Sequence, residues 1–127
     1  MFCRCGRKFS LKTTLMVADQ LLCRLEVLHA KNHIHRDVKP DNFVTGRGNK
    51  SKLIYIIDLG LAKPFRDAGT LRHIPQAEGR DVAGSSRYLA VRAHQGEEQS
   101  RRTDLESLAY MLIYFLAGSL PWLDCPL

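Results

Sequence analysis

The longest apolar run of the chain, at residues 108–117, constrains the fold more than any other stretch. It reads L-A-Y-M-L-I-Y-F-L-A, and a helix without a polar face is normally buried on all sides. Its length is about half of a membrane span. We therefore expect a helix that begins near Arg101, is covered by other elements and ends at Gly118, because Pro121 prevents its continuation.

An amphipathic helix is predicted over about residues 11–31. Its less polar positions recur at three- and four-residue steps, and they are Leu11, Leu15, Ala18, Leu22, Leu25 and His29. Ser10 is a suitable N-cap, and Asn32 is a suitable stop. The chain has 127 residues, of which 45% are hydrophobic and 25% charged, which fits one small globular domain or a piece of a larger one.

The segment between the two helices contains two short β-prone runs. These are F-V-T at residues 43–45 and L-I-Y-I-I at residues 53–57, and the glycines at 46 and 48 favour a turn between them. We expect a small hairpin, and hence an α+β chain that is mainly helical. Residues 60–96 have no clear period, and such a long irregular stretch is usually functional or disordered.

Charge and targeting signals narrow the possible partners. The net charge of +6 and the pI near 9.4 favour phosphate groups, acidic peptides, nucleic acid or anionic membranes, unless the excess is only a solvated surface. Like charges form no long block, and aromatic residues are not interleaved with basic ones, so we expect no nucleic-acid partner. Neither a signal peptide nor a membrane span is recognisable, so we expect a soluble cytoplasmic or nuclear protein without a membrane partner.

The four cysteines give no metal-binding pattern. Cys3 and Cys5 are two residues apart, and no pair at zinc-finger spacing follows them before Cys125. Cys23 falls within the first predicted helix, where we expect a free thiol. Reduced cysteines agree with a cytosolic or nuclear location.

The octet at residues 35–42 carries the most specific chemical signal. It reads H-R-D-V-K-P-D-N and matches the pattern H-R-D-x-x-x-x-N of the protein kinase catalytic loop. Asp58, Leu59 and Gly60 begin sixteen positions (58 − 42) past Asn42, where kinases carry D-F-G. A helix before the octet and a hairpin after it complete the order, so the chain resembles a eukaryotic protein kinase.

That resemblance implies roles for four polar residues. Transfer of a γ-phosphoryl group needs positioning and neutralisation of negative charge. Asp37 would accept and orient the proton of the substrate hydroxyl, and Lys39 would contact the transferred phosphate of ATP. Asn42 and Asp58 would supply oxygen ligands to Mg²⁺, a hard cation that prefers them. A lysine at position 39 is typical of serine/threonine kinases.

Three further residues near the octet are implied by the same resemblance. Arg36 would lie beside the activation segment. Val44 would form an apolar floor for adenine, and Ile57 would lie at the back of the nucleotide site. Plain strand packing is the alternative reading of Val44 and Ile57.

The chain is most similar to the casein kinase 1 family. The similar segments are residues 9–19, 53–63, 73–75, 98–107 and 118–122, including the blocks E-Q-S-R-R and H-I-P. Asp104 matches the kinase helix aspartate that accepts N–H groups of the catalytic loop, which explains a charge before so apolar a helix, because a buried carboxylate must be satisfied. The family favours serine or threonine near upstream acidic or phosphorylated residues.

Two arginines are candidates for recognising such an acidic substrate. Arg87 matches the family arginine that binds the anion, and Arg80 is a second candidate. The planar guanidinium suits phosphate because it donates two hydrogen bonds at once. The alternative is that both arginines are solvated surface residues.

Several positions depart from the family pattern. Leu59 replaces the phenylalanine of D-F-G, and Ala109 replaces a glycine in the apolar helix. Ala90 and Arg92 replace a polar pair in the segment that would contact substrate. Asp124 follows Leu123 where the family has Gln-Gly, and near the anion site its charge would repel a phosphate.

The resemblance implies a partial kinase domain over residues 1–127. Its order is an αE-type helix, the catalytic loop, D-L-G, an activation segment and an αF-type helix. We expect a C-terminal lobe without the N-terminal lobe, because no glycine-rich loop or partner lysine is recognisable. The chain would then be a fragment or a truncated product, inactive alone. We also expect poor solubility, because the apolar helix from Leu108 would need cover from later helices that these residues do not include. The alternative function is a non-catalytic pseudokinase or binding module.

Overall fold

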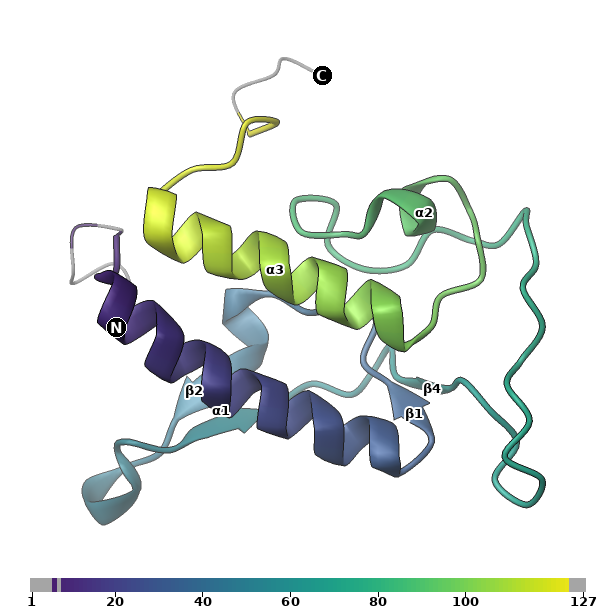
Figure 1. Ribbon diagram of the computed structural model, residues 1–127, viewed down its shortest axis with the longest axis horizontal. Helices are drawn as coiled ribbons and strands as arrows, with labels where there is room; N and C mark the ends of the chain where they lie inside the picture. The colour runs from purple at the N-terminus through teal and green to yellow at the C-terminus, as the bar shows by residue number, and fades with distance from the viewer. Residues whose placement is uncertain (1–5, 7, 124–127) are drawn as a thin grey trace.

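The computed structural model describes residue 6 and residues 8–123, and its elements are mixed α and β (Figure 1). The described elements, in chain order, are α1 (Leu11–Ala30), β1 (His33–Ile34), a 3₁₀ turn (Pro40–Asn42), β2 (Phe43–Thr45), a second 3₁₀ turn (Gly48–Lys50), β3 (Ile54–Ile56), β4 (Lys63–Pro64), α2 (Val91–His94) and α3 (Arg101–Ala117). The predicted α+β class is therefore confirmed. Cys3, Cys5, Cys125 and Asp124 lie outside the described residues.

The ends of α1 follow the capping residues that the sequence indicates. Ser10 Oγ accepts a hydrogen bond from the N–H of Thr13 at 3.1 Å, which satisfies one of the free donors of the first turn. Asn32 has a φ of 66°, a left-handed conformation that asparagine tolerates better than most residues. The predicted helix is confirmed to within one residue, and Cys23 on it is a free, exposed thiol.

Two small antiparallel sheets lie beside α1. In the first, β2 pairs with β3 with Val44 opposite Tyr55, and the N–H of Gly46 donates to Leu53 O at 3.0 Å to close the turn. This is the predicted hairpin, although its second strand is shorter than expected. In the second sheet, β1 pairs with β4. Strands of two residues have no readable period, so this pairing is not predictable from the sequence pattern.

Residues 60–96 are largely irregular, as predicted. Within residues 60–96 the regular elements are β4 and the single-turn helix α2. The rest of this segment runs along one side of the structure (Figure 1).

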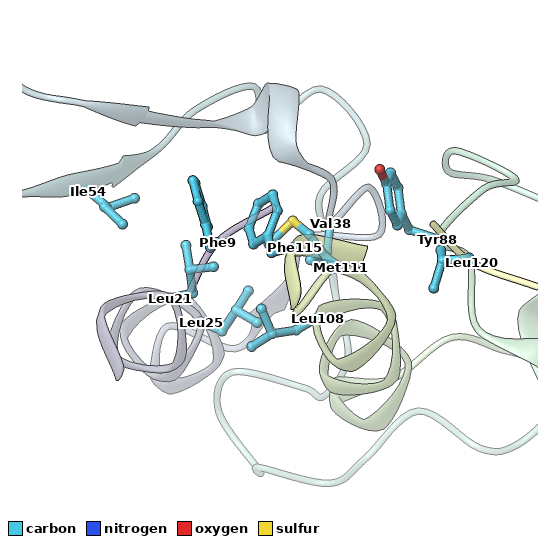
Figure 2. Packing of buried hydrophobic residues seen from close by; sticks show 10 residues of the cluster. All are labelled: Phe9, Leu21, Leu25, Val38, Ile54, Tyr88, Leu108, Met111, Phe115 and Leu120. Atoms are coloured by element: carbon cyan, nitrogen blue, oxygen red, sulfur yellow. The ribbon is translucent and has the colours of Figure 1, made fainter. Parts of the chain in front are cut away.

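The core forms where α1 and α3 lie side by side and run in opposite directions (Figure 1). Figure 2 shows its ten buried members, with Leu25 and Leu108 between the two helices. These residues are Phe9, Leu21, Leu25, Val38, Ile54, Tyr88, Leu108, Met111, Phe115 and Leu120. Phe9 also joins the chain before α1 to α3, because its N–H donates to Phe115 O at 2.8 Å.

One face of α3 is exposed in the part of the chain that the structure describes, although an apolar helix is normally buried on all sides. Leu108, Met111 and Phe115 face the core at three- and four-residue steps, but Ile113 is 50% exposed and Leu116 is 44% exposed. The described elements cover one face of α3, so apolar side chains on its other face are exposed. None of the described helices is long and apolar enough to cross a membrane.

A leucine-to-alanine pair on α1 tests this assignment of the core. Leu25 is fully buried, whereas Leu15 is 59% exposed. We expect Leu25→Ala to lower the free energy of unfolding by about 2–5 kcal/mol, because it removes buried methyl groups and leaves a cavity. Leu15→Ala should change it by less than about 0.5 kcal/mol. Urea unfolding followed by circular dichroism measures both, and equal effects would contradict the assigned packing.

Candidate active site

The loop at residues 35–42 is anchored by Asp104, a carboxylate on α3 that is 1% exposed. Its Oδ2 accepts the N–H of His35 at 2.8 Å, and its Oδ1 accepts the N–H of Arg36 at 2.9 Å. His29 Nε2 lies 2.8 Å from Oδ2 and provides a third contact. A buried carboxylate without hydrogen-bond donors is very unfavourable. The two loop N–H groups and the His29 ring therefore stabilise the Asp104 carboxylate on α3.

This anchor holds Arg36 in an uncommon backbone conformation. Arg36 has a φ of 67°, in the left-handed region, and its Nε donates to Leu61 O at 2.6 Å. A Cβ on Gly84 would lie 2.3 Å from Arg36 O, so only glycine lets this segment approach the loop closely. The residues that follow Gly84 are thereby brought against the octet.

His35 joins the same loop to the end of β3. Its ring is fully buried; Nδ1 accepts the N–H of Asp37 at 3.2 Å, and Nε2 lies 3.2 Å from Ile57 O. A backbone N–H can only donate and a carbonyl can only accept, so the proton resides on Nε2. The ring therefore fixes Asp37 relative to Ile57 and to Asp58, the next residue.

The carboxylate of Asp37 is the centre of a cluster drawn from two distant segments. Its Oδ1 accepts both the N–H of Ser85 at 2.9 Å and the hydroxyl of Ser85 at 2.7 Å. Its Oδ2 accepts Lys39 Nζ at 2.7 Å and Asn42 Nδ2 at 3.1 Å. Lys39 Nζ also donates to the Ser85 hydroxyl at 3.0 Å. Each carboxylate oxygen thus accepts two hydrogen bonds, which orients the group fully.

These contacts keep Asp37 ionised. Burial raises the pKa of Asp37, but the hydrogen bonds from Lys39 and Ser85 outweigh it and hold the pKa below its usual value. The hydrogen bond to Asp37 raises the pKa of Lys39 in turn, so the pair stays charged at neutral pH. A carboxylate of lowered pKa is a weak base, but it remains an ionised hydrogen-bond acceptor at neutral pH.

Asn42 and Asp58 lie at neighbouring ends of the hairpin strands. The Nδ2 of Asn42 donates to Asp37 O at 2.8 Å, and the N–H of Ile57 donates to Asn42 O at 2.9 Å. Among the described residues nothing donates to Asn42 Oδ1. Asp58 is exposed, and its Oδ1 accepts the N–H of Gly60 at 3.2 Å. Two oxygen-bearing side chains thus remain available beside Asp37.

The apolar candidates near the site are partly open. Val44 is 40% exposed and Ile57 is 41% exposed, while Leu59 of D-L-G is 52% exposed. Val44 also lines an apolar hollow of about 230 Å³ with core residues of α1 and α3. These exposures fit an apolar surface for a ligand, and strand packing alone does not bury the two side chains.

The two arginines predicted to bind an anion have different surroundings. Arg80 Nε lies 3.0 Å from Glu98 Oε2, and Lys63 binds the other oxygen of the same buried carboxylate. Arg87 is exposed, and its carbonyl accepts the indole N–H of Trp122 at 2.8 Å. The guanidinium of Arg80 is therefore already paired in this state.

Sequence reasoning missed the contacts of two polar residues, Ser85 and Glu98. Ser85 touches both Asp37 and Lys39, and Glu98 holds Lys63 across the activation segment. Ser85 lies in the G-S-S-R-Y run and Glu98 in E-Q-S-R-R, so both were within recognised motifs. The motif letters alone carry no distance, and only folding shows that Ser85 reaches Asp37 and that Glu98 pairs with Lys63 and Arg80.

A family model described as the protein kinase domain matches residues 3–125. The match extends over nearly the whole chain, and the chain belongs to the protein kinase domain family. This family in general transfers a phosphoryl group from ATP to a protein substrate with the help of Mg²⁺.

The residues present suit Mg²⁺ chemically. Asn42 and Asp58 offer hard oxygen donors, and Mg²⁺ is usually bound by one or two protein groups together with substrate phosphates and water. Within the described residues no cluster of three His, Cys, Asp or Glu side chains forms a denser metal site. The donor set therefore agrees with a cation shared with a nucleotide.

Replacing the anchoring carboxylate tests whether the loop depends on it. Asp104→Asn should lower the free energy of unfolding by about 2–4 kcal/mol, because charge-assisted hydrogen bonds to His35 and Arg36 are weakened and an amide N–H₂ faces donors. Amide exchange at these two residues should also quicken. Asp19→Asn, at an exposed position of α1, is the matched control. Unchanged exchange in Asp104→Asn would reject the anchor.

Proposed function

We propose that this chain carries the catalytic residues of a serine/threonine protein kinase of the casein kinase 1 type. Such an enzyme transfers the γ-phosphoryl group of ATP to a serine or threonine hydroxyl of a protein substrate. The observation that supports this most directly is the cluster in which Lys39, Asn42 and Ser85 all bind the Asp37 carboxylate. This cluster orients an ionised carboxylate beside a protonated lysine, which is an arrangement suited to phosphoryl transfer to a hydroxyl.

Each polar residue then has a task. Asp37 orients the substrate hydroxyl toward the phosphorus and receives its proton as transfer proceeds. Lys39 neutralises charge on the transferred group, because its ammonium lies 2.7 Å from Asp37 and stays protonated. Asn42 and Asp58 would hold Mg²⁺, which supplies neutralisation of the phosphate oxygens when bound. Val44 and Ile57 would contact the adenine.

Serine/threonine specificity is supported by Lys39 and Ser85 together. Lys39 follows the catalytic aspartate by two residues, which is typical of kinases of this specificity. The Ser85 hydroxyl connects Lys39 to Asp37, so the substrate-binding segment is fixed against the catalytic loop.

A preference for acidic or phosphorylated substrates is part of the proposal. Arg87 has an exposed guanidinium and matches the family arginine for this anion. Arg80 adds positive charge but is shared with Glu98, so its contribution depends on loosening a 3.0 Å ion pair. We place the reaction in the cytoplasm or nucleus, where protein substrates of this kind meet ATP.

A non-catalytic pseudokinase is the second candidate function. Leu59 replaces the aromatic ring of D-F-G, and the 127 residues include no G-x-G-x-x-G motif to cover the phosphates. A pseudokinase would bind a partner protein or peptide but would not transfer a phosphoryl group. A transfer assay separates the two functions when the chain is used together with whatever sequence naturally flanks it.

The first test of kinase activity removes the charge of Asp37. With radiolabelled ATP and a serine peptide, Asp37→Asn should lower turnover by roughly 10²–10⁴-fold, the usual effect of losing a general base. Asp41→Asn, at an exposed position of the same loop, is the control and should retain most activity. Equal transfer by Asp37→Asn and the parent protein rejects the assigned role, and no transfer by the parent protein favours the pseudokinase.

A second test addresses the anion site. Arg87→Ala should raise the KM for a peptide with a phosphoserine upstream of the acceptor by about tenfold, or about 1.4 kcal/mol. A neutral peptide of the same length should keep its KM. Arg47→Ala, an exposed arginine near the hairpin turn, is the control. An equal loss for both peptides would show that Arg87 does not read the charge.

A further inference from the structure

A second hollow lies between the C-terminal half of α1 and the N-terminal half of α3, two helices that run side by side in opposite directions (Figure 1). Its volume is about 580 Å³, and α1 contributes Leu22, Glu26, His29 and Ala30 to its walls. Arg101 and Leu105 of α3 face them, and Arg66 joins from the segment after β4. We call this hollow the α1–α3 groove.

The α1–α3 groove is cationic at one end. The guanidinium carbon of Arg101 lies 4.6 Å from the centre of the Phe65 ring, and that of Arg66 lies 5.2 Å from the same ring. Phe65 is fully buried, so both arginines rest on a fixed aromatic floor. Stacking of this kind orients the planar guanidinium and leaves its N–H edge free for an anion.

Neither guanidinium forms an ion pair with any of the described carboxylates. Arg66 Nε donates to the side-chain oxygen of Asn32 at 2.5 Å, which holds the side chain in place without neutralising it. By contrast, the neighbouring Arg102 pairs with Glu97 at 3.2 Å. Two oriented, uncompensated positive charges on one aromatic ring therefore mark this end of the groove.

The other end of the α1–α3 groove is apolar. Leu22 is 48% exposed and Leu105 is 44% exposed, and each projects from a different helix. Single exposed leucines are common on protein surfaces, but here two of them line one hollow next to two cations. Glu26, on the same wall, carries a negative charge that disfavours an acidic group at this end.

The dimensions fit a short peptide. Leu22 and Ala30 are eight helical residues apart, which corresponds to about 12 Å along α1. An extended chain covers that distance in about four residues. The α1 wall of the groove is held in place at His29, which is hydrogen-bonded to the buried Asp104 at 2.8 Å.

We propose that the α1–α3 groove docks a short segment of a partner protein that carries an acidic side chain next to an apolar one. The carboxylate lies between Arg66 and Arg101, where a bidentate pair with a guanidinium is available. The apolar side chain lies between Leu22 and Leu105. None of these residues takes part in the proposed phosphoryl transfer, so the inference does not depend on that function.

Binding of a defined peptide tests the proposal. The probe is a fluorescein-labelled peptide with two aspartates followed by two leucines, and its counterpart has lysines in place of the aspartates. Fluorescence anisotropy with the protein in its natural form should detect the acidic peptide and not the basic one. Affinity should fall as salt rises, because the contact is partly electrostatic.

Three variants locate the binding. Arg101→Glu should weaken the acidic peptide at least tenfold, and Arg101→Gln should weaken it less, which provides a milder variant if the charge reversal perturbs folding. Arg102→Glu makes the same charge change at the next residue, away from the groove, and should have little effect. Glu26→Lys should tighten binding severalfold, an effect that general structural damage does not produce.

Other results would overturn the assignment. If Arg101→Glu and Arg102→Glu weaken binding of the acidic peptide equally, the peptide is attracted only by the net charge of the protein and not by the groove. Tight binding of the basic peptide would exclude recognition of an acidic group. If Arg101→Glu abolishes self-association seen by analytical ultracentrifugation while the acidic peptide does not bind, the occupant is a second copy of the chain. Loss of binding to phosphatidylserine vesicles in that variant, again without peptide binding, would assign a membrane surface instead.

Discussion

The buried carboxylate of Asp104 determines the conformation of the catalytic loop. It accepts the N–H groups of His35 and Arg36 while α3 is packed against α1, so one side chain connects the core to the loop. The left-handed φ of Arg36 depends on this contact, because two fixed N–H groups compensate for a conformation that is unfavourable for most residues. The position of Asp37, the next residue, is therefore fixed by the hydrogen bonds of His35 and Arg36 to Asp104.

From that anchor the site extends by hydrogen bonds rather than by apolar packing. His35 joins the loop to the end of β3, and Gly84 allows Ser85 to approach Asp37. The ionised carboxylate then holds together a lysine, an amide and a hydroxyl from segments nearly fifty residues apart. An arrangement with this many charge-assisted contacts is preorganised, which is what electrostatic catalysis requires.

The same helices that form the core also present a second surface. The facing sides of α1 and α3 bury Leu21, Leu25 and Leu108 in the core. Leu22, Leu105 and Arg101, on the same two helices, line the α1–α3 groove. His29 contributes to both, since it lines the groove and contacts Asp104. A partner bound there would contact a side chain that is one hydrogen bond away from the catalytic-loop anchor.

Local rules were sufficient where local interactions decide the structure. The boundaries of α1 follow from Ser10 and Asn32, and the hairpin from alternating β-prone runs with glycine between them. The composition of α3 is apolar all round, yet Ile113 and Leu116 are exposed among the described residues. Periodicity reports which side chains avoid water, but it does not report how many elements are present to cover them.

The sequence by itself indicated the protein kinase family, the order of α1, the hairpin and α3, and the candidate residues Asp37, Lys39, Asn42 and Asp58, because fixed spacings of specific residue types carry that information. Tertiary structure alone decided that Ser85 reaches Asp37, that Glu98 already pairs with Arg80, and that Arg66 and Arg101 share the Phe65 ring. The physical reason is distance along the chain. These contacts join residues whose separation has no period, so only the packing of α1 against α3 and the course of the irregular segment bring them together.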